Sequence, residues 1–252
     1  MTYGNIGTNL TIGCMRKLKG SSSYLKNQVR KNLAKAALFI LIFGAILFGV
    51  TLRVVSTLKV GALEEAGLLL SIAPLISFYF YLRKYRIYNG GWEGEKQVAK
   101  LLTSKLNDDY YLLNDLYLRE GGGDIDHIVL GPNGVFVLET KNWRGSISCS
   151  GDEWQRAGKR NFASSPSRQV KRNAARIKQI IDSSANLRPL GIWVEGLVVF
   201  TNNHVALHVN NPAVPVLKLP QLPSYITGYR SSRSISREQL EAIGKEIIKQ
   251  KH

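Results

Sequence analysis

The chain has 252 residues, of which 44% are hydrophobic and 21% charged, so it can build a packed core and is not a disordered polyelectrolyte. Its net charge of +16 favours a polyanionic partner, either nucleic acid or the anionic surface of a membrane. The two cysteines, Cys14 and Cys149, lie far apart, which argues against a disulfide framework and against a zinc site. We expect both to be free thiols.

The positive charge is concentrated near the N-terminus. Residues 1–88 contain 12 Lys or Arg and 2 Asp or Glu, whereas residues 89–252 contain 22 and 16. Residues 1–35 hold seven of the basic residues and no acid, so we interpret them as a basic N-terminal arm, flexible or lying on a surface. Next to a membrane span such an arm binds anionic lipid headgroups; the alternative is a solvated tail.

Two apolar segments follow within residues 36–86. Ala36 to Leu52 and Ala66 to Leu82 are each 17 residues long and free of charge, which reaches the lower limit for a spanning helix. Their flanks are more basic than the linker between them, so the sequence predicts a transmembrane hairpin with both chain ends in the cytoplasm, a multi-pass protein of the cell membrane. The alternative is a pair of buried core helices.

After this hairpin, Asn89-Gly90-Gly91 predicts a flexible break and a domain boundary. Residues 92–106 then have helical periodicity, with Val98 and Leu102 on an apolar stripe that also carries Glu95. We therefore expect an acid on the inward face of this helix. The alternative for Glu95 is a carboxylate that only favours the helix dipole.

A strand at 110–118 precedes the most informative stretch, residues 124–141, which is predicted to be a β-hairpin. Asn133-Gly134 lies between two alternating apolar runs and suits a primed turn, because both residues tolerate positive φ. Side chains alternate along a strand, so Glu139 and Lys141 share one face, and Asp126 interrupts the apolar face of the first strand. These three side chains are expected to converge at one edge of the sheet.

Two neighbours of Asp126 need separate interpretation. Asp124 shares its face, and we prefer Asp126 as the leading aspartate because it lies within the strand, whereas Asp124 follows three glycines. Whether Asp124 shares the role stays open. His127 points to the opposite face and is expected to be structural.

Beyond a short third strand at 145–150, residues 156–178 contain eight basic residues and no acid. Pro166 suits the first turn of a helix capped by Ser165. The helix has an apolar stripe and a polar face that can meet phosphate; the alternative is a solvated helix whose charges serve solubility. The candidate nucleic-acid contacts are Arg168, Lys171, Arg172 and Arg176.

The remainder of the chain, 201–252, is expected to pack on the core. Residues 192–200 and 214–219 are predicted strands, and a C-terminal amphipathic helix begins at a capping box formed by Ser236 and Gln239.

The predicted edge suits phosphodiester hydrolysis. This reaction needs a divalent cation to polarise the phosphate and activate water, and hard cations prefer carboxylate ligands. Asp126 and Glu139 supply two carboxylates. Lys141 can orient or deprotonate the water, or neutralise charge that develops on the phosphate.

Together these motifs resemble the nuclease-related domain, NERD, of the PD-(D/E)XK nuclease superfamily. The resemblance covers residues 89–200 and rests on Gly91-Trp92-Glu93-Gly94-Glu95, Asp124-Ile125-Asp126-His127, Glu139-Thr140-Lys141-Asn142, Gly145, Trp154 and Pro166-Ser167-Arg168-Gln169. It implies an α/β fold with an α-β-β-β-α-β core, a mixed sheet flanked by helices, and cleavage that depends on Mg²⁺ or Mn²⁺. By position it implies Glu95, Asp126 and Glu139 as metal ligands, Lys141 as the lysine of the E-x-K pair, and Gln169 as the polar residue of the second core helix.

The leading hypothesis is therefore a membrane-anchored, metal-dependent nuclease that acts on nucleic acid, with DNA favoured, on the cytoplasmic side. A catalytically silent nucleic-acid-binding or scaffold module is the alternative, and an enzyme of membrane signalling with another substrate is a third. The sequence does not say whether DNA or RNA is cut, or whether cleavage is endo- or exonucleolytic. It also leaves open the specificity, the biological process and the oligomeric state.

Overall fold

The computed structural model describes residues 15–17, 24–118, 124–158, 162, 164–231 and 233–250. The helices are α1 (Tyr24–Thr57), α2 (Ala62–Lys105), α3 (Pro166–Ser183), α4 (Leu222–Gly228) and α5 (Arg237–Lys249), with the short 3₁₀ turns η1 (Arg188–Leu190) and η2 (Leu219–Gln221). The strands are β1 (Arg16–Lys17), β2 (Tyr111–Tyr117), β3 (Asp124–Gly131), β4 (Gly134–Lys141), β5 (Gly145–Gly151), β6 (Glu153–Arg156), β7 (Val194–Phe200), β8 (Val205–Pro212) and β9 (Val216–Lys218). The chain divides into two compact units, residues 23–93 and residues 1–22 with 94–252.

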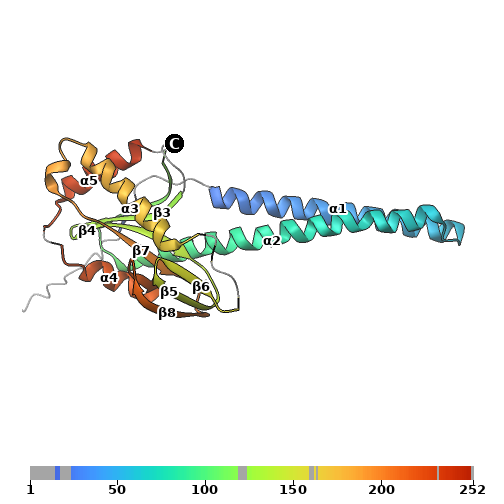
Figure 1. The fold of residues 1–252 in the computed structure, drawn as a ribbon. Coiled ribbons are helices and arrows are strands. Elements are labelled where there is room, and N and C mark those ends of the chain that lie inside the picture. The colour runs from blue at the N-terminus through green and yellow to red at the C-terminus, as the bar shows by residue number, and fades with distance from the viewer. Residues whose placement is uncertain are drawn as a thin grey trace, which may run out of the picture. The chain divides into compact units, whose positions relative to one another are not determined.

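The unit of residues 23–93 is made of α1 and most of α2 (Figure 1). Among the described residues, α1 and α2 are long and apolar enough to cross a bilayer, and the most apolar window of α1 is 0% buried and that of α2 11% buried. The two helices contact each other through stacked rings of Phe39 and Tyr81, whose centroids are 5.5 Å apart. Near the turn between them, Arg53 Nε lies 2.6 Å from Glu64 Oε1.

The structure differs from two expectations about the N-terminal half. The break at Asn89-Gly90-Gly91 is absent, because α2 is helical through these residues. Each glycine costs a helix roughly 1 kcal/mol, which a helix of 44 residues tolerates. The basic arm also does not extend to residue 35, since α1 begins at Tyr24. Arg16 and Lys17 form an edge strand, whereas residues 1–14, which include Cys14, and residues 18–23 lie outside the described residues.

The main sheet is mixed, as expected. In the described chain its strand order is β1-β2-β3-β4-β7-β9, with β2, β3 and β4 antiparallel and β4, β7 and β9 parallel. The connection from β4 to β7 passes through α3, as a parallel crossover requires. Along the chain, the end of α2, then β2, β3, β4, α3 and β7 follow the expected α-β-β-β-α-β order.

The predicted hairpin is present, but its turn is one residue earlier than expected. Gly131 pairs with Gly134, so Pro132 and Asn133 form the turn, and Gly134 alone of these has positive φ (+148°). Proline fixes φ near the value that the first central position of a common turn needs. Asn133 is fixed instead by tertiary contacts, because its Nδ2 donates to the carbonyls of Ile226 and Tyr229. The alternation of faces along β4 is unaffected.

Each face of the main sheet is covered by helices. Val135 and Val137 pack with α3 and α5, whereas Phe136 and Leu138 pack with the last turns of α2 and with α4. In Figure 1, α3 and α5 lie on one side of the sheet and α4 on the other. The ends of α3 and α5 follow the sequence signals: Ser165 Oγ accepts from the Arg168 N–H, and Ser236 and Gln239 form the capping box.

A second sheet was not predicted as such. The described strands β6, β5 and β8 form it, with β5 antiparallel to β6 and parallel to β8. The predicted strand at 145–150 therefore belongs to this sheet and not to the one that carries the hairpin. Strand β8 escaped prediction because most of its side chains are exposed and give no strong alternation. Cys149 on β5 is a buried free thiol, as expected.

Candidate active site

Four predicted residues meet where β3 begins and β4 ends, and we call Glu95, Asp126, Glu139 and Lys141 the acidic edge. His127 pairs with Leu138, so Asp126 faces Glu139 when the same register continues. Glu95 comes from the last turns of α2. Its charge acts on Asp126, and the charge of Glu139 acts on both carboxyls. The convergence predicted for the hairpin and the preceding helix is therefore present.

Glu139 and Lys141 form an ion pair in the interior. The Glu139 side chain is 2% exposed and the Lys141 side chain 18%, and Lys141 Nζ donates to Glu139 Oε1. Glu139 Oε2 is buried without a hydrogen-bond partner. Burial raises the pKa of Glu139, against the lowering effect of Lys141 and, more weakly, of Arg172. Burial would lower the pKa of Lys141, but the carboxylates of Glu139 and Asp126 raise it above its ordinary value.

Asp126 is held by the backbone of the next strand. The Thr140 N–H donates to Asp126 Oδ2 at 2.6 Å, which fixes the carboxyl relative to β4. Burial raises the pKa of Asp126 well above its ordinary range, and the charges of Glu139 and Glu95 raise it further. For Asp124 the pKa is raised by burial alone. Of the two aspartates, Asp126 therefore interacts more strongly with the other carboxyls of the site.

Glu95, which comes from α2, also has a raised pKa. Burial, then the charges of Asp115 and Glu139, raise its pKa to about 8. The helix approaches the sheet closely at the preceding residue, because a Cβ on Gly94 would lie 2.9 Å from Thr201 Oγ1 and 3.2 Å from Asn142 Cβ. Glycine at this position therefore lets α2 bring Glu95 to the ends of the strands.

Asp115 is a carboxylate of this site that the sequence analysis missed. It lies on β2 between Asn114, which pairs with His127, and Leu116, which pairs with Ile125, so it is opposite Asp126. Its φ of +52° is uncommon for a non-glycine residue, and such strained residues cluster at functional sites. The available signal was an Asn-Asp pair inside an apolar strand, since both residues tolerate left-handed φ.

Comparison with known proteins identifies the domain. Residues 90–201 match the family model described as NERD, nuclease-related domain. The chain carries a nuclease-related domain. It is 39% identical over 82 residues to an uncharacterized protein of Bacillus anthracis, and this match covers 31% of this chain and 39% of that protein. It is also 26% identical over 165 residues to a protein of Streptomyces coelicolor named "Probable kinase PglW", and this match covers 61% of this chain and 10% of that protein. No solved structure matches the chain.

The nuclease-related domain contains oxygen donors that suit a hard cation. Across the described ranges, no three His, Cys, Asp or Glu side chains are arranged as a ready metal-binding group. The donor set nevertheless fits such an ion, because the buried Glu139 Oε2 has no hydrogen-bond partner and the pKa values of Glu95 and Asp126 are raised by burial and by neighbouring carboxylates. A divalent cation would offset the repulsion between these carboxylates.

Helix α3 of the nuclease-related domain brings only part of its predicted basic face to the acidic edge. Arg172 is exposed, and its charge reaches Glu139. Arg168 and Lys171 instead form ion pairs with Glu153 and Asp152, so their charge is partly compensated. Arg176 is half-buried with an unpartnered Nη1.

The polar face of α3 also carries two amides. Gln169, the predicted polar residue, is half-buried in the first turn of the helix. One turn later, the buried Asn173 donates from Nδ2 to the Asp124 carbonyl at 3.4 Å and so connects α3 to the start of β3. Asn173 carries no distinctive signal in the sequence, because an asparagine at helical spacing looks like any other polar position until the fold buries it.

His127 has the structural role that was predicted. It is 1% exposed and its Nδ1 lies 2.8 Å from Asn114 Oδ1 on the neighbouring strand. Burial lowers its pKa to about 3, so the imidazole is neutral over the physiological range.

Proposed function

We propose that the chain is a metal-dependent nuclease that hydrolyses phosphodiester bonds at the acidic edge. The observation that carries this proposal is the gathering of Glu95, Asp126 and Glu139 around Lys141 inside a nuclease-related domain. Buried carboxyls that repel one another are costly to keep in a fold, and perturbed pKa values of this kind cluster at functional sites.

In this proposal Asp126 and Glu139, with Glu95, would hold Mg²⁺ or Mn²⁺. When bound, the cation polarises the phosphate and lowers the pKa of the attacking water. Without it, Glu95 keeps its proton at neutral pH because its pKa is about 8, so cation binding at Glu95 requires release of that proton. The raised pKa of Lys141 keeps Nζ protonated, which supports a role in neutralising phosphate charge over a role as a base.

The substrate that this site favours is nucleic acid, with DNA preferred. Arg172 is the arginine of α3 whose charge reaches the acidic edge, and it suits the substrate backbone best. Gln169, Arg168, Lys171 and Arg176 complete the proposed contact face. The ion pairs of Arg168 and Lys171 would have to open for phosphate to bind there.

We further propose that α1 and α2 anchor the protein in the cell membrane as a hairpin. Both helices are long and apolar enough, and large side chains such as Leu41 and Phe48 on α1 are 70% exposed. The positive-inside rule would place both chain ends in the cytoplasm. Extraction tests the anchor: the chain should stay in the membrane fraction at alkaline pH and move to the supernatant only in detergent. If alkaline pH alone released the chain, the proposed membrane anchor would be wrong.

Cleavage is tested with the 252-residue chain in detergent, using DNA and RNA with Mg²⁺, Mn²⁺ or EDTA. Asp126→Asn and Glu139→Gln keep the shape of each side chain and should abolish metal-dependent cleavage. Asp109→Asn, which changes an exposed carboxylate between α2 and β2 outside both the acidic edge and α3, should leave it unchanged. Nucleic acid that binds equally to all four proteins without being cut would instead establish the silent binding module.

A further inference from the structure

A polar pocket lies at the end of β4 opposite the acidic edge. It has a volume of 290 Å³ and lies between Gly134 at the start of β4, the η1 turn, the residues before β7, and residues 229–231 and 233–235. The acidic edge lies where β4 ends, so the two sites are separated by the length of the strand. We call this hollow the arginine pocket because Arg230 and Arg233 line it and no acidic residue does.

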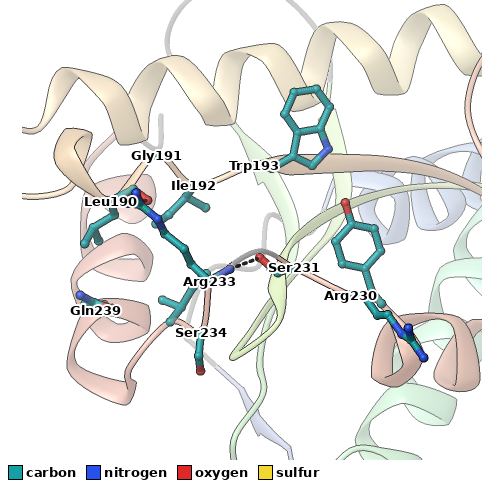
Figure 2. A pocket seen from close by; sticks show the side chains of 12 residues that line it. Leu190, Gly191, Ile192, Trp193, Arg230, Ser231, Arg233, Ser234 and Gln239 are labelled. Atoms are coloured by element: carbon teal, nitrogen blue, oxygen red, sulfur yellow. Dashed lines mark hydrogen bonds between the residues drawn. The ribbon is translucent and has the colours of Figure 1, made fainter.

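The positive charge of the arginine pocket is not compensated within its lining. Arg233 Nη1 donates to the carbonyl oxygens of Leu190 at 3.2 Å and Pro189 at 3.5 Å, which orient the guanidinium without cancelling its charge. None of the ion pairs among the described residues includes Arg230 or Arg233. Figure 2 shows Arg233 extending toward Leu190 and Gly191, with Arg230 on the other side of the hollow. Arginine in such a setting is a preferred ligand of phosphate.

The same pocket presents an aromatic surface. Trp193 is 66% exposed, although its indole is large and apolar. The ring is nevertheless fixed, because Nε1 donates to Glu195 Oε2 at 2.8 Å, and the same oxygen accepts from the Tyr229 hydroxyl at 3.3 Å. Trp193 also lines a neighbouring hollow beside α3, so it stands between two open spaces. An oriented and exposed indole is a platform on which a flat ring can stack.

Hydroxyl and amide groups complete the lining. Ser231 and Ser234 come from the loop that carries both arginines, and Gln239 comes from α5. Ser231 Oγ accepts from the Arg233 N–H at 3.3 Å, which fixes the loop around the guanidinium (Figure 2). The volume of 290 Å³ is just below the roughly 300–1,000 Å³ of drug-sized ligand pockets, and therefore suits one small ligand.

We propose that the arginine pocket binds a nucleoside phosphate, with the phosphate at Arg233 and Arg230 and the base against Trp193. The ligand can be a free mononucleotide or the phosphorylated end of a nucleic-acid strand, since both present the same groups. Binding here does not depend on cleavage at the acidic edge, because the two sites share no residue.

The test is calorimetric titration of the 252-residue chain in detergent with EDTA present, so that the acidic edge cannot cleave. The probes are AMP, adenosine, inorganic phosphate and a short DNA strand with or without a 5′-phosphate. We expect AMP to bind at least about tenfold more tightly than adenosine or phosphate, since only AMP offers both the base that stacks and the charged phosphate. Competition by the phosphorylated strand would identify a strand end as the ligand, and its failure to compete would identify the free nucleotide; both results support the proposal.

Variants locate the binding. Arg233→Ala and Trp193→Ala should each weaken AMP binding about tenfold, whereas Trp193→Phe should keep most of it. Arg188→Ala, an exposed arginine on η1 outside the lining, and Asp126→Asn at the acidic edge should bind as the parent does. Thermal melting confirms that each variant is folded. Absence of AMP and strand binding by the parent, unchanged affinity of the Arg233 and Trp193 variants, or phosphate that binds as tightly as AMP would each overturn the proposal.

Discussion

The two ends of β4 differ in the sign of their charge and in how that charge is supported. At the acidic edge, carboxyls are buried beside one another and raise each other's pKa, so the fold holds them against desolvation and repulsion. At the arginine pocket, Arg230 and Arg233 are exposed, and the Arg233 guanidinium is held by neutral carbonyl oxygens. A charged group lowers the free energy of unfolding substantially only where it is buried away from water. Substitutions at the two ends should therefore have very different consequences for stability.

The largest effect is expected for Lys141→Met. This change leaves Glu139, which is 2% exposed, without its cation. Removing one partner of a buried pair costs roughly 3–5 kcal/mol of unfolding free energy, measured by denaturant unfolding. The double variant Glu139→Gln with Lys141→Met should recover much of this loss, because no unpaired charge stays buried. If the double variant were as unstable as Lys141→Met alone, the loss would come from packing and not from an unpaired charge.

The pH dependence of stability should follow Glu95. Its pKa is raised from 4.5 to about 8, so between these values the folded chain keeps a proton that the unfolded chain releases. The unfolding free energy contributed by Glu95 should therefore fall as pH rises from 4.5 to 8, at about 1.4 kcal/mol per pH unit. Glu95→Gln should flatten that fall in melting experiments without divalent cations, and Glu153→Gln should not. An unchanged slope for Glu95→Gln would mean that Glu95 is ionised throughout.

Gly94→Ala should damage the acidic edge without touching a charge. The new Cβ would meet Thr201 Oγ1 at 2.9 Å, so the helix or the strand end must shift. Overpacking of this kind costs about 1–3 kcal/mol. Gly228→Ala is the matched control, because nothing lies within 4 Å of its Cβ position and it has no positive φ. Equal melting temperatures for the two variants would show that the contact at Gly94 relaxes freely.

A gain in stability is expected from Asp115→Gly. Glycine adopts the φ of +52° without strain, which should raise the unfolding free energy by about 1 kcal/mol. The same change removes a charge that raises the pKa of Glu95, so that pKa should fall. Asp115→Ala removes the charge but keeps the strain, and should not be stabilised. Stabilisation by both variants would assign the gain to charge alone.

The smallest effect on stability is expected at the arginine pocket. Arg233→Ala removes a solvated guanidinium whose partners are two carbonyl oxygens, so the unfolding free energy should change by no more than about 1 kcal/mol. A loss comparable with that of Lys141→Met would break the contrast between the two ends of the sheet.

Sequence alone determined the elements whose signals are local. The alternation of β3 and β4 placed Asp126, Glu139 and Lys141 together, helical spacing placed Glu95 on the inward face, and the caps at Ser165 and Ser236 fixed two helix starts. In each case side-chain direction follows from the backbone period of one element, or from one hydrogen bond within a turn. The nuclease-related domain was predicted from the resemblance of its motifs to that family, and the family match at residues 90–201 confirms it.

Only the tertiary structure decided the features that depend on segments distant in sequence. Asp115 belongs to the site because β2 pairs with β3, and the pKa of Glu95 is about 8 because burial and three neighbouring carboxylates act on it at once. The second sheet, the ion pairs of Arg168 and Lys171, and the arginine pocket likewise join residues far apart in the chain. Desolvation and Coulomb interactions depend on distances through space, which no local pattern encodes.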